Sequence, residues 1–177
     1  MKAYLRNAGE SDLDLLFQWV NDKEVRKNSF QTKEITYEEH QKWFMDMLHR
    51  EDVKQYIYVL DEESVGQIRI CLNKEEAEIS YSIVPKYRCM GYGKQMIEAL
   101  KKVVQEEYPK VKRLVAQVKS ENVASQKVFL DCGYQEKCRE YVLDLEMTEK
   151  DAIMSNFSSG RKVEGVFTQN VKYFSHS

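Results

Sequence analysis

The sequence predicts one layered domain of the mixed α/β class, and two features of the chain support this fold class. Three strand patterns follow one another between residues 56 and 84 with short connections, which favours antiparallel pairing. A strand, a helix and a second strand then follow between residues 77 and 119, an order typical of a parallel crossover. The length of 177 residues fits one ordinary domain, which can bury a core without a metal or a disulfide.

The first third of the chain predicts a short strand followed by two helices. Residues 3–7 form the strand pattern, and Ser11 begins the first helix with Asp14 three residues later as a capping acid. Apolar residues then recur at helical spacing. They are Leu13, Leu16, Phe17 and Val20. Thr36 and Glu39 repeat the capping pattern, so a second helix is expected to begin there.

The middle of the chain predicts three strands. Residues 56–60 and 65–72 are separated by the acidic turn DEES, and residues 77–84 alternate apolar and polar side chains. Pro85 ends the third strand because proline cannot donate to a ladder.

The next segment alternates helix and strand. A helical apolar face runs from 91 to 107 and is closed by Pro109, and residues 113–119 form a strand pattern. The stretch SENVASQKVFLDCGY begins with polar capping residues and predicts a helix that ends at Gly133, a natural residue after a helix. YQEK and YVLDLEM (134–137 and 141–147) predict two closing strands or one long bent strand.

Composition and charge argue against several classes of partner. The net charge is -2 and the pI about 6.0, whereas nucleic-acid binders usually carry a basic surplus. The four cysteines form no CxxC pair and have no histidine at ligand spacing, so we expect no metal and free thiols in a reducing cytosol. The N-terminus has no apolar signal region and no run of eighteen apolar residues occurs, so a cytoplasmic protein without a membrane span is expected. The oligomeric state stays open, with a homodimer as one alternative.

The segment YRCMGYGKQM (87–96) lies where a strand gives way to a helix, and it predicts an anion site. A helix N-terminus presents unpaired N–H groups and a partial positive charge, and Gly91 and Gly93 let a phosphate come close. Arg88 and Lys94 add charge on either side. The alternative is that the glycines only make a tight turn. Neither the third glycine of the dinucleotide fingerprint nor a Walker A loop is present.

Two motifs resemble those of the GNAT superfamily of N-acetyltransferases. Arg88 to Gly93 matches the signature R/Q-x-x-G-x-G/A, and Asn122 to Ser125 resembles the second hallmark, N-x-x-S/A, followed by a short helix that ends in Gly133 and Tyr134. The resemblance covers about residues 3–146 and implies a GNAT domain over 1–146. That fold has a central, mostly antiparallel twisted sheet with one splayed parallel strand pair and helices on both faces. Residues 147–177 lie outside it, as a loosely ordered tail or as an added strand or hairpin.

The resemblance implies acetyl-CoA as co-substrate, with no metal. The end of the strand would offer backbone groups to the pantetheine amides, as an added strand does. The loop amides would hold the pyrophosphate, and the second motif would meet the pantetheine or the helix start. The thioester would lie in the gap between the splayed strands. The implied binding residues are Ile83, Val84, Arg88, Cys89, Met90, Gly91, Tyr92, Gly93, Lys94, Asn122, Ser125 and Phe129.

Acetyl transfer needs a base for the amine, a donor for the oxyanion and a proton for the leaving thiolate. Many relatives carry a tyrosine where Phe129 stands and some carry a glutamate where Gln117 stands, and neither replacement can exchange a proton. Glu78, acting through water, and His40 are the candidate catalytic residues. The alternatives are a solvated strand residue for Glu78 and a substrate-holding or loop-capping residue for His40. Tyr81 and Tyr134 are expected in the core.

The acceptor side is predicted from residues 19–44. The patterns W-x-N-D-x-x-V-R and E-E-H-x-x-W-F resemble the branch that acetylates nucleotide-linked amino sugars, of the pseudaminic acid pathway type. The candidate substrate residues are Asn21, Asn28, Trp43 and Gln67. The aromatic residues suit stacking on a base or a sugar, or they fill the core. Ribosomal-protein alanine acetyltransferases share the overall pattern, so a protein α-amine is the alternative acceptor. A non-catalytic acetyl-CoA-binding module is the third reading.

Overall fold

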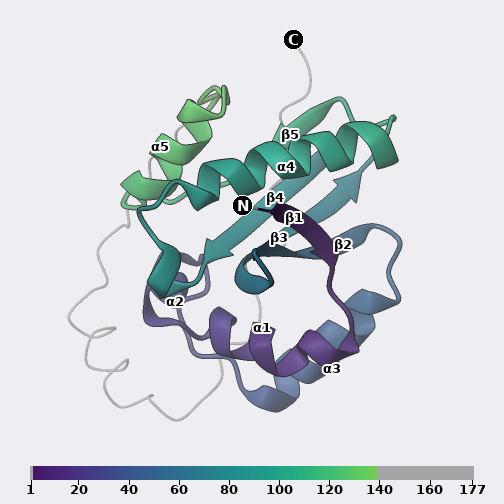
Figure 1. Ribbon diagram of the computed structural model, residues 1–177, viewed down its shortest axis with the longest axis vertical. Coiled ribbons are helices and arrows are strands. Elements are labelled where there is room, and N and C mark those ends of the chain that lie inside the picture. Colours follow the sequence, from purple (N-terminus) through teal and green to yellow (C-terminus); the bar gives the residue numbers. More distant parts are fainter. Residues whose placement is uncertain (1, 139–177) are drawn as a thin grey trace, which may run out of the picture. The chain divides into compact units, whose positions relative to one another are not determined.

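The computed structural model describes residues 2–138, and the first unit of the chain ends at Glu136. The first unit holds one five-stranded sheet in the order β1-β2-β3-β4-β5 (Figure 1). The strands are β1 (Ala3–Asn7), β2 (Val53–Leu60), β3 (Glu63–Asn73), β4 (Glu76–Ile83) and β5 (Arg113–Val115). All neighbours are antiparallel except β4 and β5, which are parallel. The predicted mixed α/β class is confirmed.

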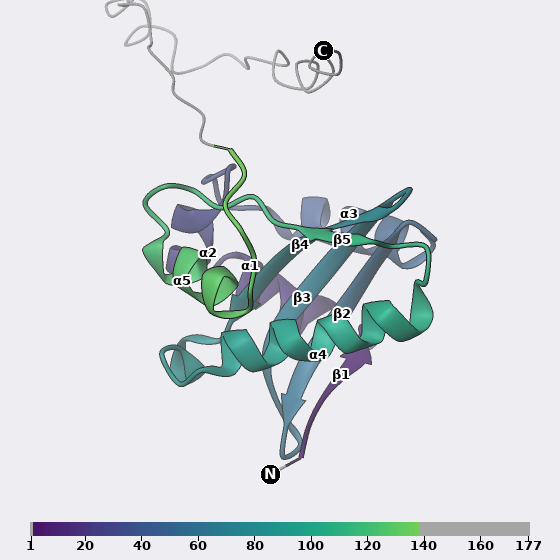
Figure 2. The same ribbon diagram turned by 90° about the horizontal axis from the view of Figure 1, so that it is seen from above.

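Helices cover both faces of this sheet. The longest, α4, lies along one face, while α1 and α3 lie on the other (Figure 2). The helices are η1 (Glu10–Asp12), α1 (Leu13–Val20), α2 (Lys23–Asn28), α3 (Tyr37–Leu48), η2 (Pro85–Tyr87), α4 (Tyr92–Glu107) and α5 (Val123–Asp131). The capping box predicted at the start of α3 is present, with the Thr36 hydroxyl accepting from the Glu39 N–H and the Glu39 carboxylate from the Thr36 N–H.

The strand alternation separates two apolar cores. On the α4 face, β2, β3 and β4 bury residues such as Tyr58, Ile68 and Ile79 against Met96 and Leu100 of α4. On the opposite face, the residues between them in β2 pack with α1 and α3. This second cluster contains Leu16, Phe44, Met47, Val53, Ile57 and Val59. A two-sided sheet of this kind follows from the period of two, because successive side chains point to opposite faces.

Helix α1 begins at Leu13, not at Ser11, and its capping acid is not Asp14. The Asp12 carboxylate accepts the Gly9 N–H at 2.9 Å and two hydrogen bonds from Arg6, at 2.7 and 2.8 Å. The hydrogen bonds from Arg6 lower the pKa of Asp12 against the effect of its burial. Asp14 instead accepts from the Tyr37 hydroxyl at 2.8 Å. A buried acid with a fixed cation partner thus replaces the exposed cap that the sequence pattern predicted.

Three other elements differ from the prediction. Helix α2 was not predicted, because its six residues carry no buried side chain and hence no periodic signal. Strand β5 ends at Val115, although the apolar pattern continues to residue 119. YQEK is not a strand within residues 134–137. The second closing strand, the domain boundary at residue 146 and the tail at 147–177 lie outside the described residues.

Gly66 brings β3 and β4 together near the end of β4. It pairs with Ile83, and a Cβ at this position would lie 2.7 Å from the Ser82 carbonyl oxygen and 2.8 Å from Ile83 Cδ1. The first of these atoms belongs to the backbone and cannot move aside without shifting the strand.

We predict that Gly66→Ala lowers the free energy of unfolding by about 1–3 kcal/mol, the usual cost of overpacking. Urea denaturation measures the change, with Gly9→Ala as the control, since nothing lies within 4 Å of a Cβ there. The direction of the change in unfolding free energy is informative, because alanine in place of glycine normally stabilises a strand. Equal effects of the two variants would contradict the close approach of β3 and β4.

Candidate active site

The parallel pairing of β4 and β5 stops after three residues. It joins Glu76, Ala77 and Glu78 to residues 113–115, whereas β4 continues to Ile83. Beyond Glu78, β4 therefore has a strand neighbour only on its β3 side within the part of the chain that the structure describes. This opening is the splayed strand pair that the sequence resemblance implied, and it exposes a strand edge to a ligand.

The two predicted backbone contacts at the end of β4 already have protein partners. The Ile83 carbonyl accepts a hydrogen bond from Arg88 Nε at 3.0 Å, and the Val84 N–H donates to the Val65 carbonyl at 3.0 Å. Because strand groups alternate between edges, Tyr81 and Ile79 present their peptide groups on the same side as Ile83. The edge of β4 without a strand partner therefore extends back from Ile83 to Tyr81 and Ile79.

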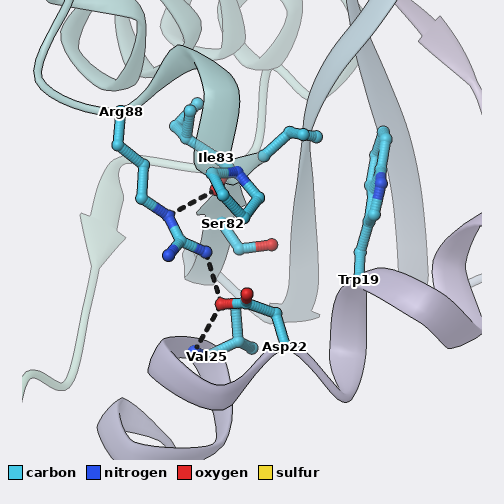
Figure 3. A pocket seen from close by; sticks show the side chains of 8 residues that line it. Trp19, Asp22, Val25, Ser82, Ile83 and Arg88 are labelled. Carbon is cyan, nitrogen blue, oxygen red and sulfur yellow. Dashed lines mark hydrogen bonds and ion pairs between the residues drawn. The ribbon is translucent and has the colours of Figure 1, made fainter.

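Arg88 connects the end of β4 to the corner between α1 and α2. Besides Ile83, its guanidinium donates to the Asp22 carboxylate, which also caps α2 by accepting the Val25 N–H at 3.1 Å (Figure 3). Burial alone would raise the pKa of Asp22, but the hydrogen bonds from Arg88 and Val25 outweigh it and hold the pKa below its usual value. Arg88 thus positions the loop that follows it, and its charge is already paired.

The loop after Arg88 turns sharply into α4. Cys89 and Gly91 have φ of +61° and +83°, and Gly91 is the N-cap residue of the helix. The first N–H to bond back into the helix is that of Gln95, which donates to Gly91 at 3.2 Å. The amides of Tyr92, Gly93 and Lys94 precede it and have no intrahelical partner, as at every helix start.

Charge and space at this helix start both favour an anion. The first turn of α4 contains no acid, and Cys89, Met90 and Lys94 are exposed at its end. Lys94 Nζ lies 3.9 Å from the Glu98 carboxylate, a long and solvent-exposed pairing that leaves its charge available. The amides and the lysine together can hold a pyrophosphate.

The second motif builds the start of α5 and meets β4. Asn122 Oδ1 accepts the Ser125 N–H at 3.2 Å, so of its two predicted roles the helix start is the one that the structure shows. The Ser125 hydroxyl lies 3.1 Å from the Tyr81 hydroxyl. Phe129 is buried, with its ring edge-on to Tyr81 at 5.6 Å.

The pairing of Tyr81 with Ser125 was not predicted from the sequence. Tyr81 packs against the core as expected. Its hydroxyl lies beside Ser125 of α5, and its ring contacts the ring of Phe129. Burial raises the pKa of Tyr81, against the opposing effect of the bond to Ser125, so the phenol keeps its proton at neutral pH. The alternation of Ile79, Tyr81 and Ile83 assigns all three to one face and could have pointed to this position.

Polar side chains gather on the other face of the open strand. Glu78 and Ser80 are exposed, and Ser82 accepts a hydrogen bond from Gln67 Nε2 at 3.1 Å. The Gln67 Oε1 in turn accepts from Gln55. Trp43 of α3 is 39% exposed and stacks under Arg69 of β3, whose guanidinium lies 5.1 Å from the ring centroid. Glu78, Gln67 and Trp43, predicted separately, therefore lie on one face of the sheet.

Three other predicted residues have their surroundings or partners within the protein. His40 is buried among the rings of Phe17, Trp43 and Phe44, and burial lowers its pKa despite an opposing contact with the Leu13 backbone. Asn21 donates to the Ile35 carbonyl and accepts its N–H, at 2.8 and 2.9 Å. Asn28 donates to the Glu24 carbonyl at 2.9 Å. Both asparagine side chains therefore hold local backbone.

Within residues 2–138 no cluster of three or more metal-ligating side chains occurs. In the same part of the chain no helix has both the length and the apolar character to cross a bilayer.

Comparison with known proteins supplies the family. The family model for the acetyltransferase (GNAT) domain matches residues 2–135, most of the chain. No curated protein matches.

Solved structures share the fold at low sequence identity. The aminoglycoside acetyltransferase AAC(6')-Ib with ribostamycin and coenzyme A has a TM-score of 0.70 at 18% identity, over 77% of this chain and 85% of that one. Spermidine N-acetyltransferase from Vibrio cholerae, with CoA and spermine, has a TM-score of 0.70 at 17% identity, over 80% and 88%. RimL, a ribosomal-protein alpha-N-acetyltransferase, has a TM-score of 0.66 at 21% identity, over 75% and 79%.

The open edge of β4, the unpaired helix start of α4 and the family match agree, and the chain belongs to the GNAT acetyltransferase domain family as an N-acetyltransferase.

Proposed function

We propose that this enzyme transfers the acetyl group of acetyl-CoA to the primary amine of a nucleotide-linked amino sugar, by direct attack in a ternary complex. The observation that carries the transfer is the opening of the sheet after Glu78, which has an anion-binding helix start on one side and a polar face on the other. A donor and an acceptor can thus approach one thioester from opposite faces of β4.

The donor half of the proposal rests on groups that the fold leaves unpaired. The pyrophosphate of acetyl-CoA binds the amides of Tyr92, Gly93 and Lys94, with the Lys94 ammonium beside it. The pantetheine amides pair with the free edge of β4 near Tyr81, as an added strand. Arg88 contributes by holding the loop through Asp22 and Ile83.

In the proposed reaction, the acceptor amine binds on the polar face of β4. Glu78 takes the proton of the attacking amine through a water molecule, because its exposed carboxylate lies where the strands part. The amine then attacks the thioester carbon, and the carbon–sulfur bond breaks. The Tyr81 hydroxyl gives its proton to the leaving thiolate, since it is the proton-bearing group that the fold places beside Phe129. Holding the two reactants together supplies a further share of the rate.

The sugar acceptor is supported by the sequence pattern of residues 19–44 and by the half-exposed Trp43, whose ring suits a sugar or a base. An α-amine of a protein is the second candidate, favoured by the fold shared with RimL.

The acceptor panel is the first test. Thiol release from acetyl-CoA is followed with UDP-linked 4-amino sugars, a peptide with a free α-amine, spermidine and no acceptor. We expect release that depends on the nucleotide sugar. Release with the peptide alone would assign the protein acceptor instead. Tight acetyl-CoA binding without release in any arm would favour the non-catalytic module.

Gly91 tests the donor site. Its φ of +83° costs an alanine about 1–2 kcal/mol of strain, and the loop relaxes to relieve it. We predict that Gly91→Ala raises the KM for acetyl-CoA about tenfold. Gly133→Ala is the matched control, because Gly133 has a φ of +85° and is equally open, but follows α5. The prediction fails if both variants change the KM alike.

The proposed proton-transfer roles predict that substitutions at Glu78 and Tyr81 lower kcat, whereas a substitution at His40 does not. Glu78→Gln and Tyr81→Phe should each lower kcat about 100-fold or more with little change in the KM for acetyl-CoA, since general acid–base groups usually contribute about 10²–10⁴. His40→Phe should leave kcat within a few-fold, because His40 is buried among aromatic rings that a phenylalanine can also pack against.

The same His40→Phe variant should alter the pH dependence of stability. The pKa of His40 is lowered in the folded state from 6.5, so the unfolded chain binds this proton more readily. Its contribution is present above pH 6.5 and is lost as the pH falls below that value. We expect the decline in unfolding free energy on acidification to be shallower in the variant. A kcat loss in His40→Phe at unchanged stability would restore His40 as the base.

A further inference from the structure

Arg69 differs from the other arginines that the structure describes. Each of the others donates a hydrogen bond to a carboxylate or to backbone carbonyls, or forms an ion pair with a carboxylate. These pairs are Arg6 with Asp12, Arg26 with Gln31 and Lys33, Arg50 with Asp52, Arg88 with Asp22, and Arg113 with Glu76. Arg69 makes no hydrogen bond and no ion pair within residues 2–138, and its Nε is buried without an acceptor. Arg26 also has a buried Nε without an acceptor, but its other nitrogens donate hydrogen bonds, whereas no nitrogen of Arg69 has a partner in the described part of the chain. The terminal N–H groups of Arg69 are therefore left for an anion.

The guanidinium of Arg69 is nevertheless held in place. It lies 5.1 Å from the centroid of the Trp43 ring, in a cation–π contact between β3 and α3. Trp43 is itself 39% exposed, so the pair borders solvent rather than the closed core. A planar guanidinium stacked on an aromatic ring keeps its outward N–H groups in a fixed fork, which matches a phosphate or a carboxylate.

The sheet register places this pair at the opening between the strands. Arg69 stands opposite Ser80 of β4, and Ser80 is two residues past Glu78, where the pairing with β5 stops. Arg69, Ser80 and Glu78 project to the same face by the strand period. Glu78 is the diagonal neighbour of Arg69, at a typical separation of about 7–8 Å for such pairs.

We propose that Arg69, stacked on Trp43, binds an anionic group of the acceptor, a phosphate or a carboxylate, while the amine of the same molecule lies toward Glu78. This inference rests on the proposed transfer to an amine and narrows its substrate class to zwitterionic acceptors. The diagonal spacing places the anion several bonds from the amine, as in an amino sugar bearing a phosphate on its far side. A polyamine has no anionic group that Arg69 could bind.

A binding experiment tests the anion site without catalysis. The protein is first saturated with CoA, so that the helix start of α4 is filled, and UDP is then titrated by calorimetry. We expect Arg69→Gln to weaken UDP binding at least tenfold, with Arg69→Lys in between because it keeps the charge and loses the fork. Arg113→Gln is the matched control, since it removes the same charge from an exposed arginine paired with Glu76. 4-Aminobutyrate is titrated in the same way as a carboxylate probe. Equal affinity of all four proteins for UDP and also for 4-aminobutyrate would overturn the inference.

A kinetic experiment identifies the source of the anion. A UDP-linked 4-amino sugar is compared with the methyl glycoside of the same sugar, and 4-aminobutyrate with its amide. Wild-type protein should prefer the anionic member of a pair at least tenfold through the acceptor KM, and Arg69→Gln should lose this preference while keeping its KM for acetyl-CoA. A preference in the first pair assigns a phosphate, and one in the second assigns a carboxylate. A wild-type enzyme that uses both members of each pair equally would overturn the inference and leave the transfer itself intact.

Failure of the proposed transfer would look different. No acceptor would then release thiol from any variant. A weaker UDP affinity of Arg69→Gln than of Arg113→Gln would still support the anion site in that case.

Discussion

The site depends on where the parallel pairing of β4 and β5 ends. Three residues of pairing fix β5 beside β4, and the absence of further pairing leaves the next part of β4 with one edge open among the described residues. After Val115 the chain leaves the sheet and leads to α5. Ser125, at the start of that helix beside the Asn122 cap, therefore contacts the open part of β4 where a longer β5 would have paired with it. Had the apolar pattern to residue 119 formed a strand, the opening would have been filled.

The two faces of β4 divide the chemistry. The α4 face carries Tyr81 and meets the helix start that suits a pyrophosphate, while the α3 face carries Glu78 and Ser80 beside Arg69. In the proposed reaction, the period of two along this single strand would keep the donor and acceptor groups on opposite faces. Gly66 and the Arg88–Asp22 pair serve this division indirectly, because they set how closely β3, β4 and α2 approach one another.

Much of this arrangement could be predicted from local patterns, and the failures have physical causes. The capping box of α3, the proline that ends β4 and the glycines at residues 91 and 133 are local signals, and the structure confirms the elements they mark. The Arg6–Asp12 pair and the bond between Arg88 and Asp22 join residues through the tertiary fold, which no local pattern reports. The same holds for Arg69 on Trp43 and for Tyr81 at Ser125. His40 has the residue type of a base, but its aromatic surroundings depend on the packing of α1 against α3.

The open edge of β4 also affects how the protein behaves in solution. An unpaired strand edge is a template on which another strand, from any chain, can add. A pantetheine arm paired along that edge removes the template, and a ligand that binds only the folded state raises its stability in proportion to the logarithm of its concentration over Kd. Under the proposed binding mode, the co-substrate would also protect the folded protein from aggregation, and protein stripped of CoA during purification would be the form most exposed to self-association.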